Sequence, residues 1–150
     1  MASRNKIFRR SNIMITLLIG NKGSGKTKKL IELANSAVES SNGNVVVLEK
    51  GAKLTYDISH RARLIDTDAY GIAGADAMAG FVCGICAGNY DVTDILIDST
   101  LKVIGRDYAV LENFVNTLQK LSESANTKIV LSVSADESDI PASISQYILK

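Results

Sequence analysis

Residues 15–27 read Ile-Thr-Leu-Leu-Ile-Gly-Asn-Lys-Gly-Ser-Gly-Lys-Thr, and this stretch decides which fold the chain can form. Its first five residues are apolar except for one threonine, which is typical of a strand with both faces buried. Its last eight residues include three glycines and two lysines. Apolar residues then recur at helical spacing, at Leu30, Ile31, Ala34, Ala37 and Val38. The chain is therefore expected to pass from a buried strand through a glycine-rich loop into a helix.

The glycine-rich loop matches the pattern G-x-x-x-x-G-K-[ST], the Walker A motif, at every fixed position. Glycines let main-chain N–H groups approach phosphate oxygens, and the start of a helix favours negative charge. Lys26 is expected to reach the β- and γ-phosphates and to act in catalysis, and Thr27 to offer its hydroxyl to Mg²⁺. The residues predicted to bind the nucleotide are Gly20, Asn21, Lys22, Gly23, Ser24, Gly25, Lys26 and Thr27. The alternative is a glycine-rich turn that holds no ligand.

A second apolar strand, predicted over residues 94–98, ends in the carboxylate of Asp98. A carboxylate in this position can hold Mg²⁺ directly or through water, and the segment resembles a Walker B element. An acid at the end of a buried strand is often only a helix cap or a turn residue. Together with the glycine-rich loop, however, the segment predicts that Asp98 and Thr27 share the magnesium ion.

The rest of the chain alternates short apolar runs with segments of helical period, which is typical of an α/β domain. The predicted strands cover residues 14–19, 45–49, 63–66, 94–98 and 128–133. Further helices are expected over residues 74–88, along the stripe of Leu111, Phe114, Val115, Leu118 and Leu121, and from Pro141 through Ile148. Residues 50–62 fit neither pattern. The prediction is a three-layer α/β sandwich with a mostly parallel five-stranded sheet.

Length and composition suit one domain, predicted over residues 14–150, after a basic tail at residues 1–13 that is expected to be disordered. Residues 1–30 carry eight Lys or Arg and no acid, yet the whole chain has a net charge of only +1, so no nucleic acid partner is expected. No apolar stretch approaches the ~20 residues of a membrane span, and two cysteines do not form a disulfide framework. A cytoplasmic location is expected, with the oligomeric state open.

With these motifs the chain resembles the P-loop NTPase superfamily, and the resemblance covers most of the sequence. It implies a parallel sheet with the nucleotide at the carboxyl ends of the strands. Residues 15–27, 45–59 and 94–102 are similar, more narrowly, to a group of short bacterial ATP-binding proteins of unassigned role that are sometimes labelled twitching-motility ATPases. That label implies little about the function of this chain.

Two other branches of the superfamily fit less well. GTPases carry a glycine at the third place from the magnesium aspartate, but here Asp98 is followed by Ser99, Thr100 and Leu101, and no Asn-Lys-x-Asp motif occurs. Proteins similar to thymidine kinase have an acid where this chain has Ser99, and they have four zinc cysteines that are absent here. ATP is therefore the expected nucleotide, while a nucleoside or nucleotide kinase remains an alternative.

Glu49 is the predicted catalytic carboxylate. RecA-like and replicative-helicase-like members of the superfamily place a glutamate at the end of the strand that follows the phosphate-loop helix, and Glu49 matches that position. The alternative is a surface acid paired with Lys50 or Lys53. The expected function is a slow, Mg²⁺-dependent ATPase that acts on or regulates an unknown protein partner, and the alternative is an ATP-dependent binding module that does not hydrolyse ATP.

Other polar residues carry weaker signals. Cys83 and Cys86 have the spacing of half a zinc site but lack the further ligands, so they are expected to be packed in a helix. Arg106 is either an arginine finger toward a neighbouring subunit or a solvated residue. Ser132, Ser134 and Asp136 lie at or just after the end of the last predicted strand, where a sensor of the γ-phosphate is found in related folds.

A basic loop precedes the third predicted strand. His60, with Arg61 and Arg63, is either a contact for the base or the γ-phosphate of a nucleotide or part of a solvated loop.

Overall fold

A five-stranded sheet forms the centre of the protein, with every neighbouring pair parallel and the order β1-β5-β4-β2-β3. The computed structural model describes residues 14–150, so the predicted basic tail at 1–13 lies outside the described residues. The strands are β1 (Ile15–Gly20), β2 (Asn44–Glu49), β3 (Arg63–Asp66), β4 (Val92–Ile97) and β5 (Lys128–Ser134). The five predicted strands are confirmed, because each predicted end lies within two residues of the observed end.

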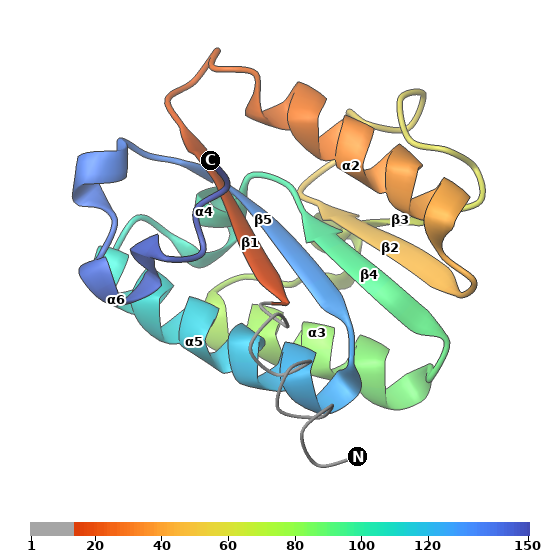
Figure 1. Cartoon of the computed structure of the whole chain (residues 1–150). Helices are drawn as coiled ribbons and strands as arrows, with labels where there is room; N and C mark the ends of the chain where they lie inside the picture. The colour runs from red at the N-terminus through yellow and green to blue at the C-terminus, as the bar shows by residue number, and fades with distance from the viewer. Residues whose placement is uncertain (1–13) are drawn as a thin grey trace, which may run out of the picture.

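Helices cover both faces of the sheet, which gives three layers (Figure 1). One face is covered by α2 (Lys26–Ser40), and the other by α3 (Ala75–Gly88) and α5 (Tyr108–Ala125). The remaining helices are α4 (Thr100–Ile104), α6 (Ala142–Ser145) and the single turns Thr67–Tyr70 and Glu137–Asp139. Across residues 14–150, no helix combines the length and the apolar character that crossing a membrane requires.

The predicted helix from Pro141 to Ile148 is wrong in its second half, because α6 ends at Ser145. Ile148 instead forms a parallel bridge with Leu17 of β1. The Leu17 N–H donates to the Tyr147 carbonyl, and the Leu149 N–H donates to the Leu17 carbonyl, each at 2.9 Å. β1 lies at the edge of the sheet, and its outer backbone groups need hydrogen-bond partners, which residues 147–149 supply.

Alternation along the strands gathers polar side chains at one corner of the sheet. The core beneath α2 includes strand side chains from the middle of the sheet, namely Val45, Val47, Leu96 and Val130. Side chains two residues apart share a face, so this face continues into Glu49, Asp98 and Ser132 at the carboxyl ends of β2, β4 and β5. α2 begins at this same end, just after β1. The sheet thereby assembles a polar corner beside the start of α2.

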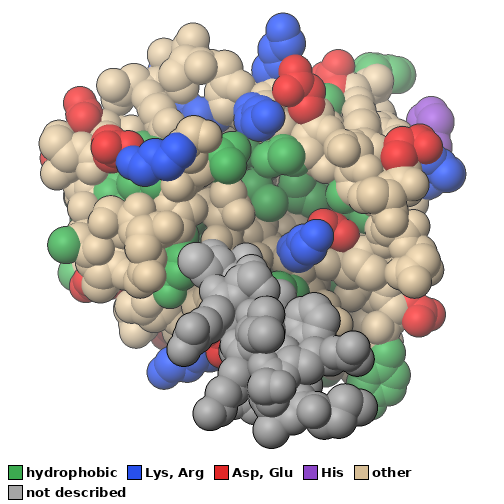
Figure 2. All heavy atoms as spheres, in the orientation of Figure 1, with side chains coloured by type: hydrophobic (Ala, Val, Ile, Leu, Met, Phe, Trp, Pro, Cys, Tyr) green, Lys and Arg blue, Asp and Glu red, His purple; other side chains and the backbone are tan. Residues whose placement is uncertain are grey.

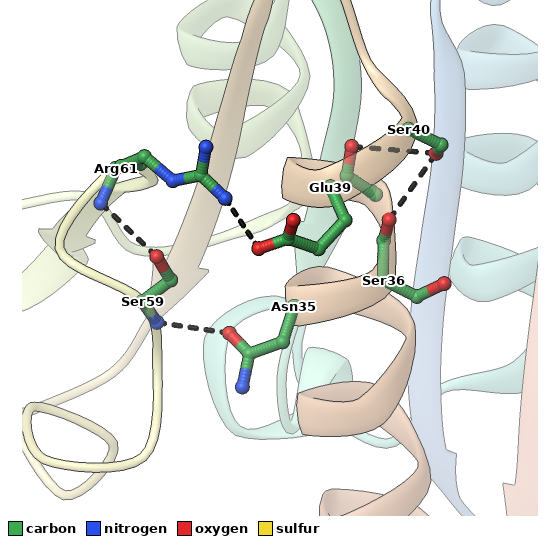
Figure 3. A network of polar contacts seen from close by, with 7 residues as sticks. Asn35, Ser36, Glu39, Ser40, Ser59 and Arg61 are labelled. Carbon is green, nitrogen blue, oxygen red and sulfur yellow. Dashed lines mark hydrogen bonds and ion pairs between the residues drawn. The ribbon is translucent and has the colours of Figure 1, made fainter.

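Residues 50–62, which the sequence leaves without an assigned element, form turns that extend the layer of α2 (Figure 1). Leu54 and Ile58 of this segment are buried in the core beneath α2. Three polar contacts join the segment to α2. Figure 3 shows two of them: the Ser59 N–H donates to Asn35 Oδ1 (2.8 Å), and Arg61 pairs with Glu39. In the third, the Asn35 amide donates to the Asp57 carbonyl (2.9 Å). The segment is therefore packed, and it fixes the chain that follows Glu49.

Candidate nucleotide-binding site

Each glycine of the phosphate loop, residues 20–27, meets a specific backbone requirement. A Cβ atom at Gly20 would lie 2.3 Å from Ser24 Oγ, so the close approach of these residues excludes a side chain there. Gly23 and Gly25 have φ angles of 86° and 90°, in the left-handed region that other residues avoid. The Ser24 N–H donates to the Asn21 carbonyl at 3.0 Å. The loop is thus tightly curled between β1 and α2, as phosphate wrapping requires.

The first turn of α2 is suited to receive an anion. No side-chain hydrogen bond caps the helix at Gly25, and its first turn contains no acidic residue. The first N–H groups of such a helix are donors for an anion, which the helix dipole also favours. The Lys26 ammonium donates to the Asn21 carbonyl at 3.1 Å and so lies back over the loop. Burial lowers the pKa of Lys26 from its ordinary value, and the charge of Asp98 opposes this shift.

Asp98 follows β4, which is separated in the sheet by β5 from β1, the strand that leads into the phosphate loop. Its side chain is buried, and Thr27 Oγ1 donates to Asp98 Oδ1 at 3.5 Å. Ser132 Oγ donates to the same carboxylate oxygen at 3.1 Å, and Ser99 Oγ donates to Asp98 Oδ2 at 3.1 Å. The two residues predicted to share Mg²⁺ are therefore brought together, and their oxygen atoms are of the type that this ion prefers.

Ser99 shapes the turn that follows Asp98. Its φ angle is 52°, a left-handed conformation that is uncommon for a residue with a side chain. The Ser99 N–H donates to Ser132 Oγ at 2.7 Å, so one hydroxyl of β5 contacts both the turn and the carboxylate of Asp98. This network couples the ends of β4 and β5 at the site.

Glu49 lies beside Asp98, because β2 pairs with β4 in the register that places Leu48 opposite Ile97, and the Asp98 N–H donates to the Leu48 carbonyl at 2.9 Å. The Glu49 residue is only 3% exposed. Its carboxylate accepts the N–H groups of Lys53 at 2.7 Å and Leu54 at 3.2 Å.

The alternative of a surface acid paired with a lysine is therefore wrong for Glu49, which is buried and caps the turn after β2. The ammonium of Lys50 pairs with Asp68 at 2.7 Å instead. The reason is the packing of residues 50–62 on α2, which covers the end of β2. Whether Glu49 also takes part in catalysis stays a prediction.

A pocket of about 690 Å³ lies between the phosphate loop and the residues that follow β4. Lys26 and Thr27 line it from the phosphate loop, and Ser99, Lys102 and Arg106 line it from the other side. Ser132 and Ser134 of β5, which the sequence suggests as sensors, also line the pocket, whereas Asp136 does not and instead accepts the Ser138 N–H. His60, Arg61 and Arg63 do not line the pocket either, since they precede or begin β3 at the amino ends of the strands.

Sequence reasoning missed the contribution of α4. This helix spans five residues, which is too short for a periodic pattern to reveal it, and so Lys102 was not predicted as a site residue. Arg106 attracts attention in the sequence as a finger toward another subunit, but the structure places it at the pocket of its own chain. Only the path of the chain after Asp98 makes this clear.

The two cysteines lie away from this pocket, on α3 beneath the other face of the sheet. Cys86 is buried and Cys83 is half-buried, and burial raises the pKa of the Cys86 thiol. Their structural role stays a prediction. Stoichiometric zinc in a metal analysis of the purified, untagged protein would contradict it.

Comparison with known proteins supports the fold and leaves the function open. No family model matches the sequence, and no curated protein is similar to it. Among solved structures, the fold is similar to that of the pCW3 conjugation coupling protein TcpA, in its monomer form with ATPγS. The TM-score is 0.56 and the identity 16%, over 90% of this chain and 47% of that chain, so this chain spans about half of that protein's length. The fold of this chain is a three-layer α/β sandwich with a parallel five-stranded sheet.

Proposed function

We propose that the chain binds ATP with Mg²⁺ in the pocket beside the phosphate loop and hydrolyses it slowly, in order to act on or regulate a protein partner. The observation that carries the proposal is the contact of Thr27 Oγ1 with Asp98 Oδ1 at 3.5 Å, which joins the start of α2 to the end of β4. It lies beside a phosphate loop whose glycines have the backbone conformations that phosphate binding requires. The similar fold of a protein solved with ATPγS supports the choice of nucleotide.

One group of residues in the site would bind the phosphates, and another would bind the metal ion. The backbone of the phosphate loop and the start of α2 would hold the phosphates, with Lys26 at the β- and γ-positions. Thr27 Oγ1 and the carboxylate of Asp98 fit Mg²⁺, because this ion takes few protein oxygens and keeps several waters. Mg²⁺ held by these residues would supply positive charge that offsets the negative charge of the phosphates.

In calorimetric titration of the purified chain, we expect ATP to bind in the presence of Mg²⁺ and to bind more weakly after chelation with EDTA. We also expect ATP to bind more tightly than GTP. The preference for ATP follows from the missing guanine motif, and the metal dependence follows from the Thr27–Asp98 pair. A folded protein that gives no binding heat with either nucleotide at millimolar concentration contradicts the proposal.

A binding module that does not turn over ATP is the second candidate, and the state of Glu49 favours it. The carboxylate of Glu49 already accepts two backbone N–H groups, and the residue after Asp98 is Ser99. A carboxylate that holds a turn together is less available to orient water. Steady-state phosphate release separates the candidates, because a module shows no turnover above background with or without its partner.

ATP and a protein are the proposed partners, and the net charge of only +1 argues against nucleic acid. A surface that binds nucleic acid gathers Lys and Arg on one face. Acidic and basic side chains are interspersed on the coloured part of the face that Figure 2 shows. Five basic residues gather instead in the lining of the pocket, which is the size of a small-ligand site.

A further inference from the structure

The pocket has a second wall that carries positive charge of its own. Lys22, Lys26 and Lys28 line the pocket from the phosphate loop and the start of α2, and Lys102 and Arg106 line it from the chain after Asp98. None of the described residues that line the pocket is acidic, and the carboxylate of Asp98 lies buried behind Thr27 and Ser132. Basic groups on both sides suit a ligand whose negative charge extends beyond the reach of the loop.

The second wall is held in place by the core. α4 buries Leu101, Val103 and Ile104 and exposes Lys102. α4 then ends at Gly105, whose φ of 91° turns the chain, and Asp107 begins α5 by accepting the N–H groups of Ala109 and Val110. The backbone of Arg106 is therefore fixed between a helix end and a helix start.

The Arg106 side chain is oriented by the neighbouring strand. Its Nη2 donates to the carbonyl of Ser134 at 2.9 Å. Ser134 ends β5 and pairs with Gly20, the first residue of the phosphate loop. The guanidinium is thus hydrogen-bonded to the strand next to the phosphate loop. It has five N–H donors, and Ser134 accepts from one of them.

We propose that Arg106 binds the γ-phosphate of a nucleotide held in the pocket of its own chain, so that the site distinguishes ATP from ADP. This rests on the proposed nucleotide binding and goes beyond it. A guanidinium keeps its charge, presents a planar set of donors to phosphate oxygens, and can supply positive charge in cis during phosphoryl transfer. Lys102, on the same wall, adds a point charge without that geometry.

The competing role for Arg106 is structural, as a hydrogen bond that ties the α4–α5 connection to β5. The two roles differ in the ratio of the affinities for ATPγS and ADP, measured with Mg²⁺ by calorimetry. For Arg106→Ala we expect ATPγS affinity to fall about 10-fold to 100-fold, because hydrogen bonds to charged groups contribute that much, while ADP affinity changes less than about twofold. A structural role lowers both affinities alike or neither.

Two further variants control for loss of folding and for a general effect of removing a positive charge. Arg106→Gln retains an amide donor for the Ser134 carbonyl but lacks the charge, so it should lose ATPγS affinity at an unchanged melting temperature. Arg61→Ala removes the same charge from an exposed arginine that pairs with Glu39 outside the pocket, and it should change neither affinity.

A mixing experiment tests whether Arg106 acts in cis. Lys26→Ala keeps Arg106 but is expected to bind nucleotide about 10²-fold or more weakly than the wild type, and Arg106→Ala keeps the phosphate loop. If Arg106 acts in cis, a mixture of the two variants binds ATPγS no more tightly than Arg106→Ala alone. A mixture that binds ATPγS as tightly as the wild type would show that Arg106 acts on a neighbouring chain. If the wild type binds ATPγS and the ratio to ADP is unchanged in Arg106→Ala, only this inference fails. If the wild type binds neither nucleotide, the proposed function fails with it.

Discussion

Replacing Lys26 with alanine is expected to weaken ATP binding by about 10²-fold or more while leaving the protein folded. The Lys26 ammonium lies over the phosphate loop, where it donates to the Asn21 carbonyl and experiences the nearby charge of Asp98. A charge-assisted hydrogen bond to phosphate is worth about 1.5–3 kcal/mol, and Lys26 is expected to contact two phosphates. The side chain is half-buried but lies outside the hydrophobic core, so its removal leaves no cavity there.

Calorimetry with Mg²⁺ and ATP measures the change, and Lys29→Ala is the matched control. Lys29 lies three residues along α2, is exposed, and does not line the pocket, so its loss changes the net charge by the same amount without touching the site. Wild-type affinity in Lys26→Ala, or an equal loss in both variants, would show that the loop does not hold the phosphates in the proposed way.

Glu49→Gln is expected to keep ATP affinity and to lose turnover by about 10²-fold to 10⁴-fold, the usual effect of removing a general base. Glu49 and Asp98 lie side by side at the ends of β2 and β4, as the prediction requires, although Glu49 does not line the pocket among the described residues. The glutamine is nearly isosteric and keeps one oxygen to accept an N–H group from Lys53 or Leu54. The melting temperature should therefore fall only modestly.

A second variant separates catalysis from the anchoring of the turn after β2. The carboxylate of Asp66 also holds this turn, because its Oδ1 accepts the Gly51 N–H at 2.8 Å, but Asp66 lies on the far side of β2 from Asp98. Asp66→Asn should loosen the same segment and leave phosphate release unchanged. Turnover of Glu49→Gln within about twofold of the wild type, far below the expected range, would make Glu49 a structural cap and favour the binding module.

The phosphate loop could be predicted from sequence because it depends on neighbours along the chain. Gly20, Gly23 and Gly25 set backbone conformations within eight residues, and the helix that follows is specified by its own apolar period. Four of the strands could be predicted for the same reason, since each is a short run rich in Val, Ile or Leu, whereas β3 has only two apolar residues. Two predicted boundaries differ from the observed ones: the start of β4 and the end of the C-terminal helix. Both are decided by pairing with another strand, namely β2 for β4 and β1 for the C-terminal segment.

Which residues meet at the site was decided by tertiary structure. Strand order places β5 between β1 and β4, so that Ser132 contacts Asp98 and Ser134 holds Arg106, and no local pattern encodes that order. Packing of residues 50–62 on α2 buries Glu49, which appears in the sequence as a charged residue at a strand end. The sequence by itself determined the strand, the loop and the helix that can hold a phosphate, because these form by local backbone preference. Contacts between segments far apart in the chain determined the second wall, because they depend on long-range strand pairing and core packing.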